Sequence, residues 1–99
     1  MLTGAQKEML HNLYRRRDTY REFFKWAEER RNNAIVTTVT TVESHSGLNT
    51  TRSIELMKEL AKIGVAEFQL GHGKNVSELK WRYDVRDVGK AAREGLFSN

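Results

Sequence analysis

The sequence predicts an α+β domain in which amphipathic helices surround a small β-hairpin. Two kinds of periodicity indicate this class. Apolar residues recur every three to four positions over residues 3–31 and again over 51–63, as in helices with one buried face. Over residues 65–70 and 79–85 apolar and polar residues alternate, which is typical of half-buried strands. With 99 residues, the chain is long enough for one domain with a single modest core.

The composition excludes several classes of protein. Hydrophobic residues make up 38% of the chain and charged residues 30%, which is too apolar for an intrinsically disordered chain. There is no cysteine, so disulfides, thiolate metal sites and cysteine nucleophiles are excluded. The first residues contain no apolar run long enough for a signal peptide or a membrane span, so we expect a cytoplasmic protein without a membrane partner.

The net charge of +4 is a mild bias toward anionic partners. Most of it lies near the start of the chain. Residues 1–31 hold eight Lys and Arg against five Asp and Glu, whereas residues 32–99 hold nine against eight. The densest cluster, Arg15–Arg17, fits either contacts to a nucleic-acid backbone or the solvated side of a helix.

The first helical stripe covers residues 3–31. Thr3 and Gln6 have the spacing of a capping box, which predicts a helix start. Residues 15–18 interrupt the apolar stripe, so two alternatives remain, one long helix or two helices. The two-helix alternative is favoured, because Asp18 or Thr19 can cap a second helix and Thr19 with Glu22 again has the capping-box spacing.

The following segment leads into a short helix. Asn32 and Asn33 predict the end of the preceding helix, because asparagine tolerates the left-handed conformation. The β-branched residues 34–37 predict a short first strand. Thr38 is expected to cap a short helix, and Thr40, which has capping-box spacing with Glu43, gives an alternative start two residues later. A strand that continues through Val42 is the alternative, since the Thr and Val run also suits a sheet.

A tight turn and a second helix come next. Gly47 supplies a positive φ for the turn, and Leu48 is the expected apolar contact between the two helices. Asn49 and the threonines after it are all competent N-caps. The helix over 51–63 is predicted to end at Gly64, with a buried stripe formed by Ile54, Met57, Leu60 and Ala61 and widened by Leu56 and Ile63.

The last third of the chain predicts a hairpin and a short helix. Residues 65–70 form the first strand, 71–75 a glycine-containing loop and 79–85 the second strand. Asp87 is expected to cap a final helix of about two turns that closes at Gly95.

The order of helix, tight turn, helix and hairpin over residues 37–85 resembles the winged helix-turn-helix superfamily. The resemblance implies a helical bundle with a β-hairpin wing over residues 19–86. Residues 1–18 would then be an N-terminal helical extension, and residues 87–99 a short C-terminal helix and tail. It also implies a small transcriptional regulator without catalytic activity or cofactor.

In winged-helix regulators the second helix of the turn enters the major groove of double-stranded DNA. The resemblance therefore assigns reading to the helix 50–63 and backbone contacts to the wing 65–85. Arginine can pair with guanine and asparagine with adenine, whereas threonine can contact a phosphate or a thymine methyl group. The helix residues among the expected contacts are equally suited to ordinary helix caps, and the strand residues are equally suited to a solvated strand face. The expected DNA contacts are Asn49, Thr50, Thr51, Arg52, Glu55, Lys58, His72, Lys74, Lys80 and Arg82.

Two other functional classes compete with DNA binding. An enzyme or metal site is disfavoured, because the three histidines are isolated and no phosphate-binding loop or nucleophile motif is present. A protein-interaction module is the stronger alternative, because the helix 50–63 is nearly neutral. A homodimer through the N-terminal segment is expected in either class, with its apolar surface supplied by Met9, Leu10, Leu13 and Tyr14.

Overall fold

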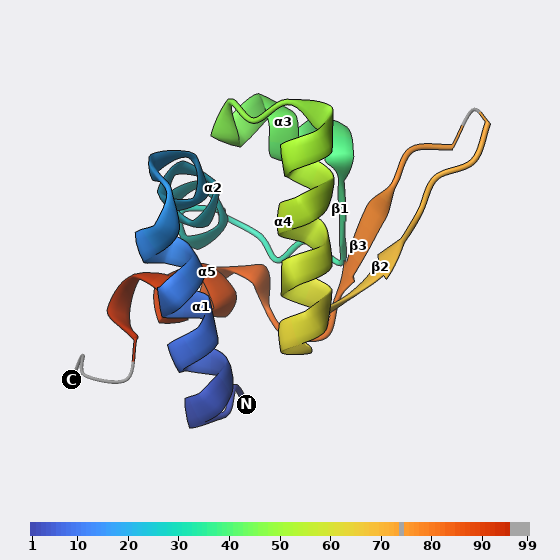
Figure 1. The fold of residues 1–99 in the computed structure, drawn as a ribbon. Coiled ribbons are helices and arrows are strands. Elements are labelled where there is room, and N and C mark those ends of the chain that lie inside the picture. Colours follow the sequence, from blue (N-terminus) through green and yellow to red (C-terminus); the bar gives the residue numbers. More distant parts are fainter. Residues whose placement is uncertain (74, 96–99) are drawn as a thin grey trace.

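The computed structural model describes residues 1–73 and 75–95 and has the predicted α+β class (Figure 1). Lys74 and the tail 96–99 lie outside the described residues. Helices gather on one side of the molecule and a long hairpin extends from the other. The elements in chain order are α1 (Gly4–Arg16), α2 (Asp18–Glu28), β1 (Val36–Thr38), α3 (Val39–Ser46), α4 (Thr50–Ile63), β2 (Ala66–Gln69), β3 (Glu78–Trp81) and α5 (Val85–Glu94).

The break between the first two helices is confirmed. Thr3 and Gln6 form the predicted capping box at the start of α1. The capping prediction for α2 is wrong, because the helix begins at Asp18 and its N-cap is Arg17. Arg17 has extended backbone angles, and within the described part of the chain its side chain makes no capping bond. The break is instead bridged by Arg21 of α2, which donates hydrogen bonds to the carbonyls of Tyr14 and Arg15 at the end of α1.

The end of α2 also differs from the prediction. The helix stops at Glu28, before the asparagine pair, and only glycines have positive φ angles among residues 1–73 and 75–95. Asn33 instead bonds to a distant part of the backbone, because its Oδ1 accepts a hydrogen bond from the N–H of Val85 at 3.1 Å. The asparagine therefore caps the start of α5 from far away in the sequence.

The predicted strand, short helix and turn are confirmed. Thr38 caps α3, since its Oγ1 accepts from the backbone N–H of Thr41 at 3.3 Å, which excludes a strand through Val42. Gly47 adopts a left-handed conformation with φ of 78°. Leu48 is 9% exposed and belongs to the core, as expected of the contact between α3 and α4.

The helix α4 begins one residue earlier than predicted, at Thr50, and Gly64 ends it with φ of 90°. Its buried face is rotated relative to the predicted stripe, because Ser53 is fully buried while Ile54 and Ala61 are only half-buried. The fully or nearly fully buried residues of α4 are Ser53, Leu56, Met57, Leu60 and Ile63.

The three strands form one antiparallel sheet in the order β1-β3-β2. Thr37 of β1 and Phe68 of β2 both pair with Leu79 of β3. The strand that lies between the first helices and α3 therefore pairs with the far strand of the hairpin. This pairing joins the base of the hairpin to the helical part of the molecule.

The predicted strand 79–85 is too long. The strand β3 ends at Trp81, and Val85 is the first residue of α5. Asp84 caps this helix in place of Asp87, since its Oδ1 accepts from the backbone N–H of Arg86 at 2.9 Å. Tertiary packing explains the error, because the apolar residues from Val85 onward recur with helical spacing and α5 packs on α1 and α2. The predicted end at Gly95 is confirmed.

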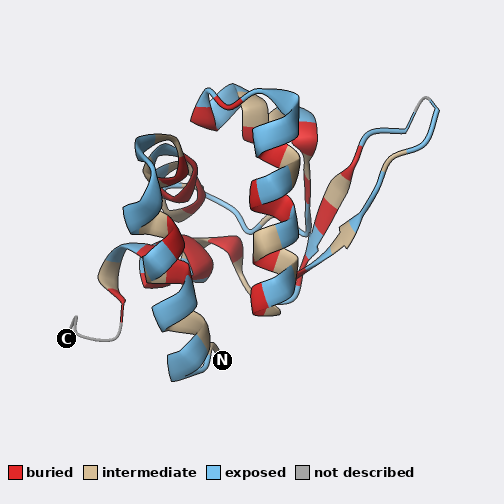
Figure 2. Cartoon of the chain, in the orientation of Figure 1, coloured by how far each residue is buried: buried red, intermediate tan, exposed pale blue. Residues whose placement is uncertain are grey.

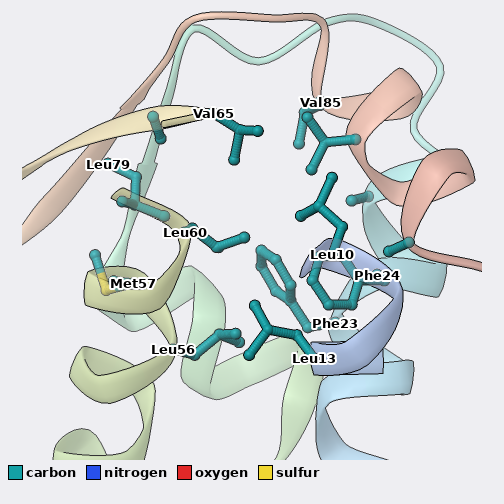
Figure 3. Close-up of a cluster of buried hydrophobic side chains, with 14 of the residues drawn as sticks. Leu10, Leu13, Phe23, Phe24, Leu56, Met57, Leu60, Val65, Leu79 and Val85 are labelled. Carbon is teal, nitrogen blue, oxygen red and sulfur yellow. The ribbon is translucent and has the colours of Figure 1, made fainter. Parts of the chain in front are cut away.

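The core contains side chains from all five described helices and from the strands (Figure 3). Leu10 and Leu13 of α1 are 0% and 2% exposed, so they belong to this core and are not available to a second subunit. Phe23 and Phe24 are both fully buried, and Val65 with Leu79 closes the sheet side. The N-terminal helix thus packs as part of the same domain core.

Candidate nucleic-acid interface

The first half of α4 has an exposed side whose residues are polar; Figure 2 shows the exposed positions of this helix in pale blue. Thr51, Glu55 and Lys58 follow the helical repeat on the face opposite the buried Leu56 and Leu60, and Thr50 and Arg52 flank this face in the first turn. The exposed residues include most of the DNA contacts that the sequence predicts in this helix, namely Thr50, Thr51, Arg52, Glu55 and Lys58. The helix therefore has one apolar face toward the core and one polar face toward solvent.

The N-terminal turn of α4 has hydrogen bonds of its own. Asn49 is the N-cap, and its Oδ1 accepts from the backbone N–H of Arg52 at 2.8 Å. Thr50 donates its hydroxyl to Glu43 Oε1 of α3 at 2.8 Å, a contact that was not predicted from the sequence. The oxygens of Asn49 and Glu43 thus hold the turn in place. Asn49 and Thr51 are both exposed residues.

Arg52 and Glu55 form an ion pair one helical turn apart, with 3.1 Å between Nη1 and Oε2. Both side chains are about half exposed, at 46% and 50%. A pair this exposed contributes at most about 1 kcal/mol, so an incoming anion or base can separate it at small cost. The pair makes the middle of the polar surface electrically neutral.

The hairpin lies against α4 on one side. The Nζ of Lys58 is 5.9 Å from the ring centroid of Phe68 in β2, a cation–π contact between helix and hairpin. Phe68 is half-buried, and Leu79 beside it is completely buried. The inner face of the sheet therefore packs toward α4, and Lys58 covers the edge of this contact.

Lys80 and Arg82 lie on the other face of the sheet. They alternate with the buried Leu79 and Trp81, so the sheet separates them from the polar surface of α4. Arg82 is paired with Glu67 of β2 at 3.2 Å. These two predicted DNA contacts therefore do not share one surface with the residues of α4.

The loop of the hairpin is closed by local hydrogen bonds. The backbone N–H of Gly71 donates to Ser77 Oγ at 2.9 Å, and that of Asn75 donates to the carbonyl of His72 at 3.0 Å. A side chain at Gly71 would overlap the backbone at Asn75 and Ser77, so glycine is required there. His72 is exposed at the tip, and the predicted contact Lys74 lies outside the described residues.

An aromatic stack beside the turn was not predicted from the sequence. The rings of Trp26 in α2 and His45 in α3 are stacked with centroids 4.7 Å apart. The guanidinium of Arg30 lies 4.9 Å from the Trp26 ring. The only sequence signal was a surplus aromatic residue next to Phe23 and Phe24, which cannot all face one core. The stack fixes the end of α3 against α2 and so helps to position the turn before α4.

The comparisons with known proteins assign no family. No protein-family model matches the chain, and no curated protein or solved structure matches it. Within residues 1–73 and 75–95, no helix is both long and apolar enough to cross a membrane. In the same residues, no group of three or more histidine, aspartate and glutamate side chains is arranged to hold a metal ion.

Proposed function

We propose that the chain is a winged helix-turn-helix domain that binds double-stranded DNA, with α4 as the reading helix. The observation that carries this proposal is the pairing of β1 with β3 around the unit α3–turn–α4. This pairing joins the hairpin to the strand that precedes α3, so that β2 and β3 lie beside α4 as a wing does. A small transcriptional regulator is the role that fits such a domain best.

The chemistry of the α4 surface suits the major groove. A single helix fits this groove with its N-terminal residues toward the base edges. Arg52 can release Glu55 and donate two hydrogen bonds to guanine, while Glu55 can accept from a neighbouring cytosine. Thr51 and the free amide group of Asn49 would contact a phosphate or a base edge beside it. The hairpin loop with His72 would reach the backbone next to the same groove.

A second candidate function is a protein-interaction module of the same fold. The ion pairs favour it, because Arg52 is neutralised by Glu55 and Arg82 by Glu67. A surface whose charges are paired in this way attracts phosphate less than one with free cations. The two functions differ in their response to salt, because only binding to DNA releases many condensed counterions.

Fluorescence anisotropy with a labelled pool of random-sequence duplex DNA tests the proposal. We expect binding with a dissociation constant of micromolar order or tighter at low salt, and a steep decrease of log K with log salt concentration. Selection from the pool should then enrich a preferred sequence. A folded protein that shows no binding at low salt would contradict DNA binding and favour the protein-interaction module.

A further inference from the structure

Three consecutive arginines occupy the corner between α1 and α2. Arg15 and Arg16 end α1, and Arg17 is the extended residue before α2. All three are exposed. We call Arg15, Arg16 and Arg17 the arginine corner. We propose that the arginine corner is a second phosphate-contact surface that holds the DNA backbone on the side of α4 away from the hairpin. The inference rests on the proposed function.

The arginine corner is free of the acidic partners that neutralise other cations. Of the ion pairs found within the described ranges, none includes Arg15, Arg16 or Arg17. The carboxylate next in the sequence, Asp18, is already paired with Arg21. Among the cation–π contacts of the described residues, the arginine corner takes part in one, in which the Arg17 guanidinium lies 5.9 Å from the Tyr20 ring centroid.

Helix stability does not account for three arginines here. Basic residues near a helix C-terminus satisfy its last carbonyls and its dipole. In α1 two of the last four carbonyls accept from Arg21, whose Nη1 donates to the carbonyl of Tyr14 at 3.2 Å and to that of Arg15 at 3.4 Å, so these two do not depend on the arginine corner. The same Arg21 links α2 to the end of α1, and the three arginines beside this link are exposed.

The helix directions bring the arginine corner to the end of the molecule where α4 begins. Gln6 Nε2, near the start of α1, donates to the carbonyl of Ile63 at the end of α4, at 3.4 Å. From this contact α1 rises about 15 Å to Arg16, and α4 extends back about 16 Å to Arg52, at 1.5 Å per residue. The two helices therefore have opposite chain directions. The end of α1 and the start of α4 both lie away from this contact, on the same side of the molecule (Figure 1).

The hairpin and the arginine corner flank α4 on opposite sides. Figure 1 shows α4 between the hairpin and the pair α1–α2, and α4 contacts both α1 and β2. A duplex that receives the start of α4 in its major groove has a phosphate backbone on each side of that groove. The hairpin loop would meet one backbone and the arginine corner the other. The arginine corner also adds three positive charges to those of Lys58 and of the paired Arg52 on α4.

The test compares two variants that remove the same charge. In R15Q/R16Q/R17Q, glutamine keeps a long side chain and a good helix propensity. The control K7Q/K62Q/K90Q removes three exposed or partly exposed lysines outside the arginine corner. Lys7 lies in the first turn of α1, Lys62 in the last turn of α4, and Lys90 within α5. Both variants lower the net charge equally, so any difference between them reports the position of the charge.

We expect the arginine-corner variant to lower the slope of log K against log salt concentration by about 2–3, because each lost phosphate contact contributes about 0.9. The control should change the slope by less than about 1, and R15K/R16K/R17K should retain the wild-type slope. The preferred sequence should be unchanged. If the glutamine triple does not fold, the single variants R15Q, R16Q and R17Q replace it, each with an expected loss of about 1 in slope.

Two results would overturn the inference, and they differ in what else they affect. If the wild type binds duplex DNA and the two triple variants show equal slopes, the arginine corner is not a contact surface, while the proposed function stands. If the wild type binds no duplex DNA at low salt, the proposed function fails together with the inference.

Discussion

The hydrogen bond between β1 and β3 allows a sharp test of how the hairpin is held. The indole Nε1–H of Trp81 donates to Thr37 Oγ1 at 2.7 Å, and the two residues are 7% and 2% exposed. The substitution Thr37→Val removes the acceptor and keeps the size and β-branching of the side chain. It leaves the buried indole N–H without its partner, whereas the core loses almost no volume.

The expected cost follows from two opposing terms. An unsatisfied buried donor costs about 1–3 kcal/mol. Replacing the hydroxyl by a methyl group offsets up to about 0.8 kcal/mol through added apolar burial. The net loss should be about 1–2 kcal/mol, which lowers the Tm by about 4–16 °C in a domain of this size.

Urea unfolding followed by circular dichroism measures this loss directly. A double-mutant cycle with Trp81→Phe isolates the hydrogen bond from other effects of the substitution. We expect Thr37→Val to cost about 1 kcal/mol less when Trp81 is already phenylalanine, because no donor is then left unpaired. An equal cost in both backgrounds, or no loss at all in the wild type, would refute the assigned role of this bond.

Three further predictions concern the helix packing, one ion pair and the proposed interface. Gly89→Ala should destabilise by about 1–3 kcal/mol in thermal unfolding, since its Cβ would lie 2.6 Å from the backbone nitrogen of Glu28, while the neighbouring exposed Lys90→Ala should change little. Hydrogen bonds from Arg93 lower the pKa of Glu28, so Arg93→Gln should destabilise at pH 7, and its difference from wild type should shrink as the pH falls below about 4. Arg52→Ala should lower the affinity for a selected DNA sequence by about 1–3 kcal/mol, measured by anisotropy, with a smaller effect on random duplex DNA.

Local chemistry made much of the fold predictable from the sequence. Thr3 with Gln6, Thr38, Gly47 and Gly64 mark helix ends by side-chain capping or by a left-handed backbone, and each was predicted correctly. These signals depend on a few neighbouring residues, so tertiary structure has little power to displace them.

The errors arose where distant packing decided the structure. Alternation over residues 79–85 continues past Trp81, but Val85 turns inward as part of a helix that packs on α1 and α2. Asn33 was expected to end α2 and is instead bonded to the backbone of Val85, 52 positions later in the chain. The contact of Asn33 leaves no local pattern in the sequence, whereas the helical spacing from Val85 onward was present in the sequence but overlapped the strand alternation.

The candidate site was predictable in its helix and only partly so in its hairpin. The exposed residues of α4 follow from amphipathic spacing, which is a local property. The pairing of Arg52 with Glu55 was not foreseen, although their spacing permits it. The solvent-facing position of Lys80 and Arg82 was expected from the strand alternation, but their separation from α4 was not, because it depends on α4 packing against the inner face of the sheet.

Amide chemical-shift mapping by NMR tests the central proposal most directly. Uniformly ¹⁵N-labelled protein would be titrated with a short random-sequence duplex at low salt. We expect shifts concentrated at residues 49–58, at the hairpin loop near His72 and at the arginine corner, with α5 unaffected. Shifts confined to α5 and the outer face of the sheet, or no shifts at all, would contradict a DNA interface on α4.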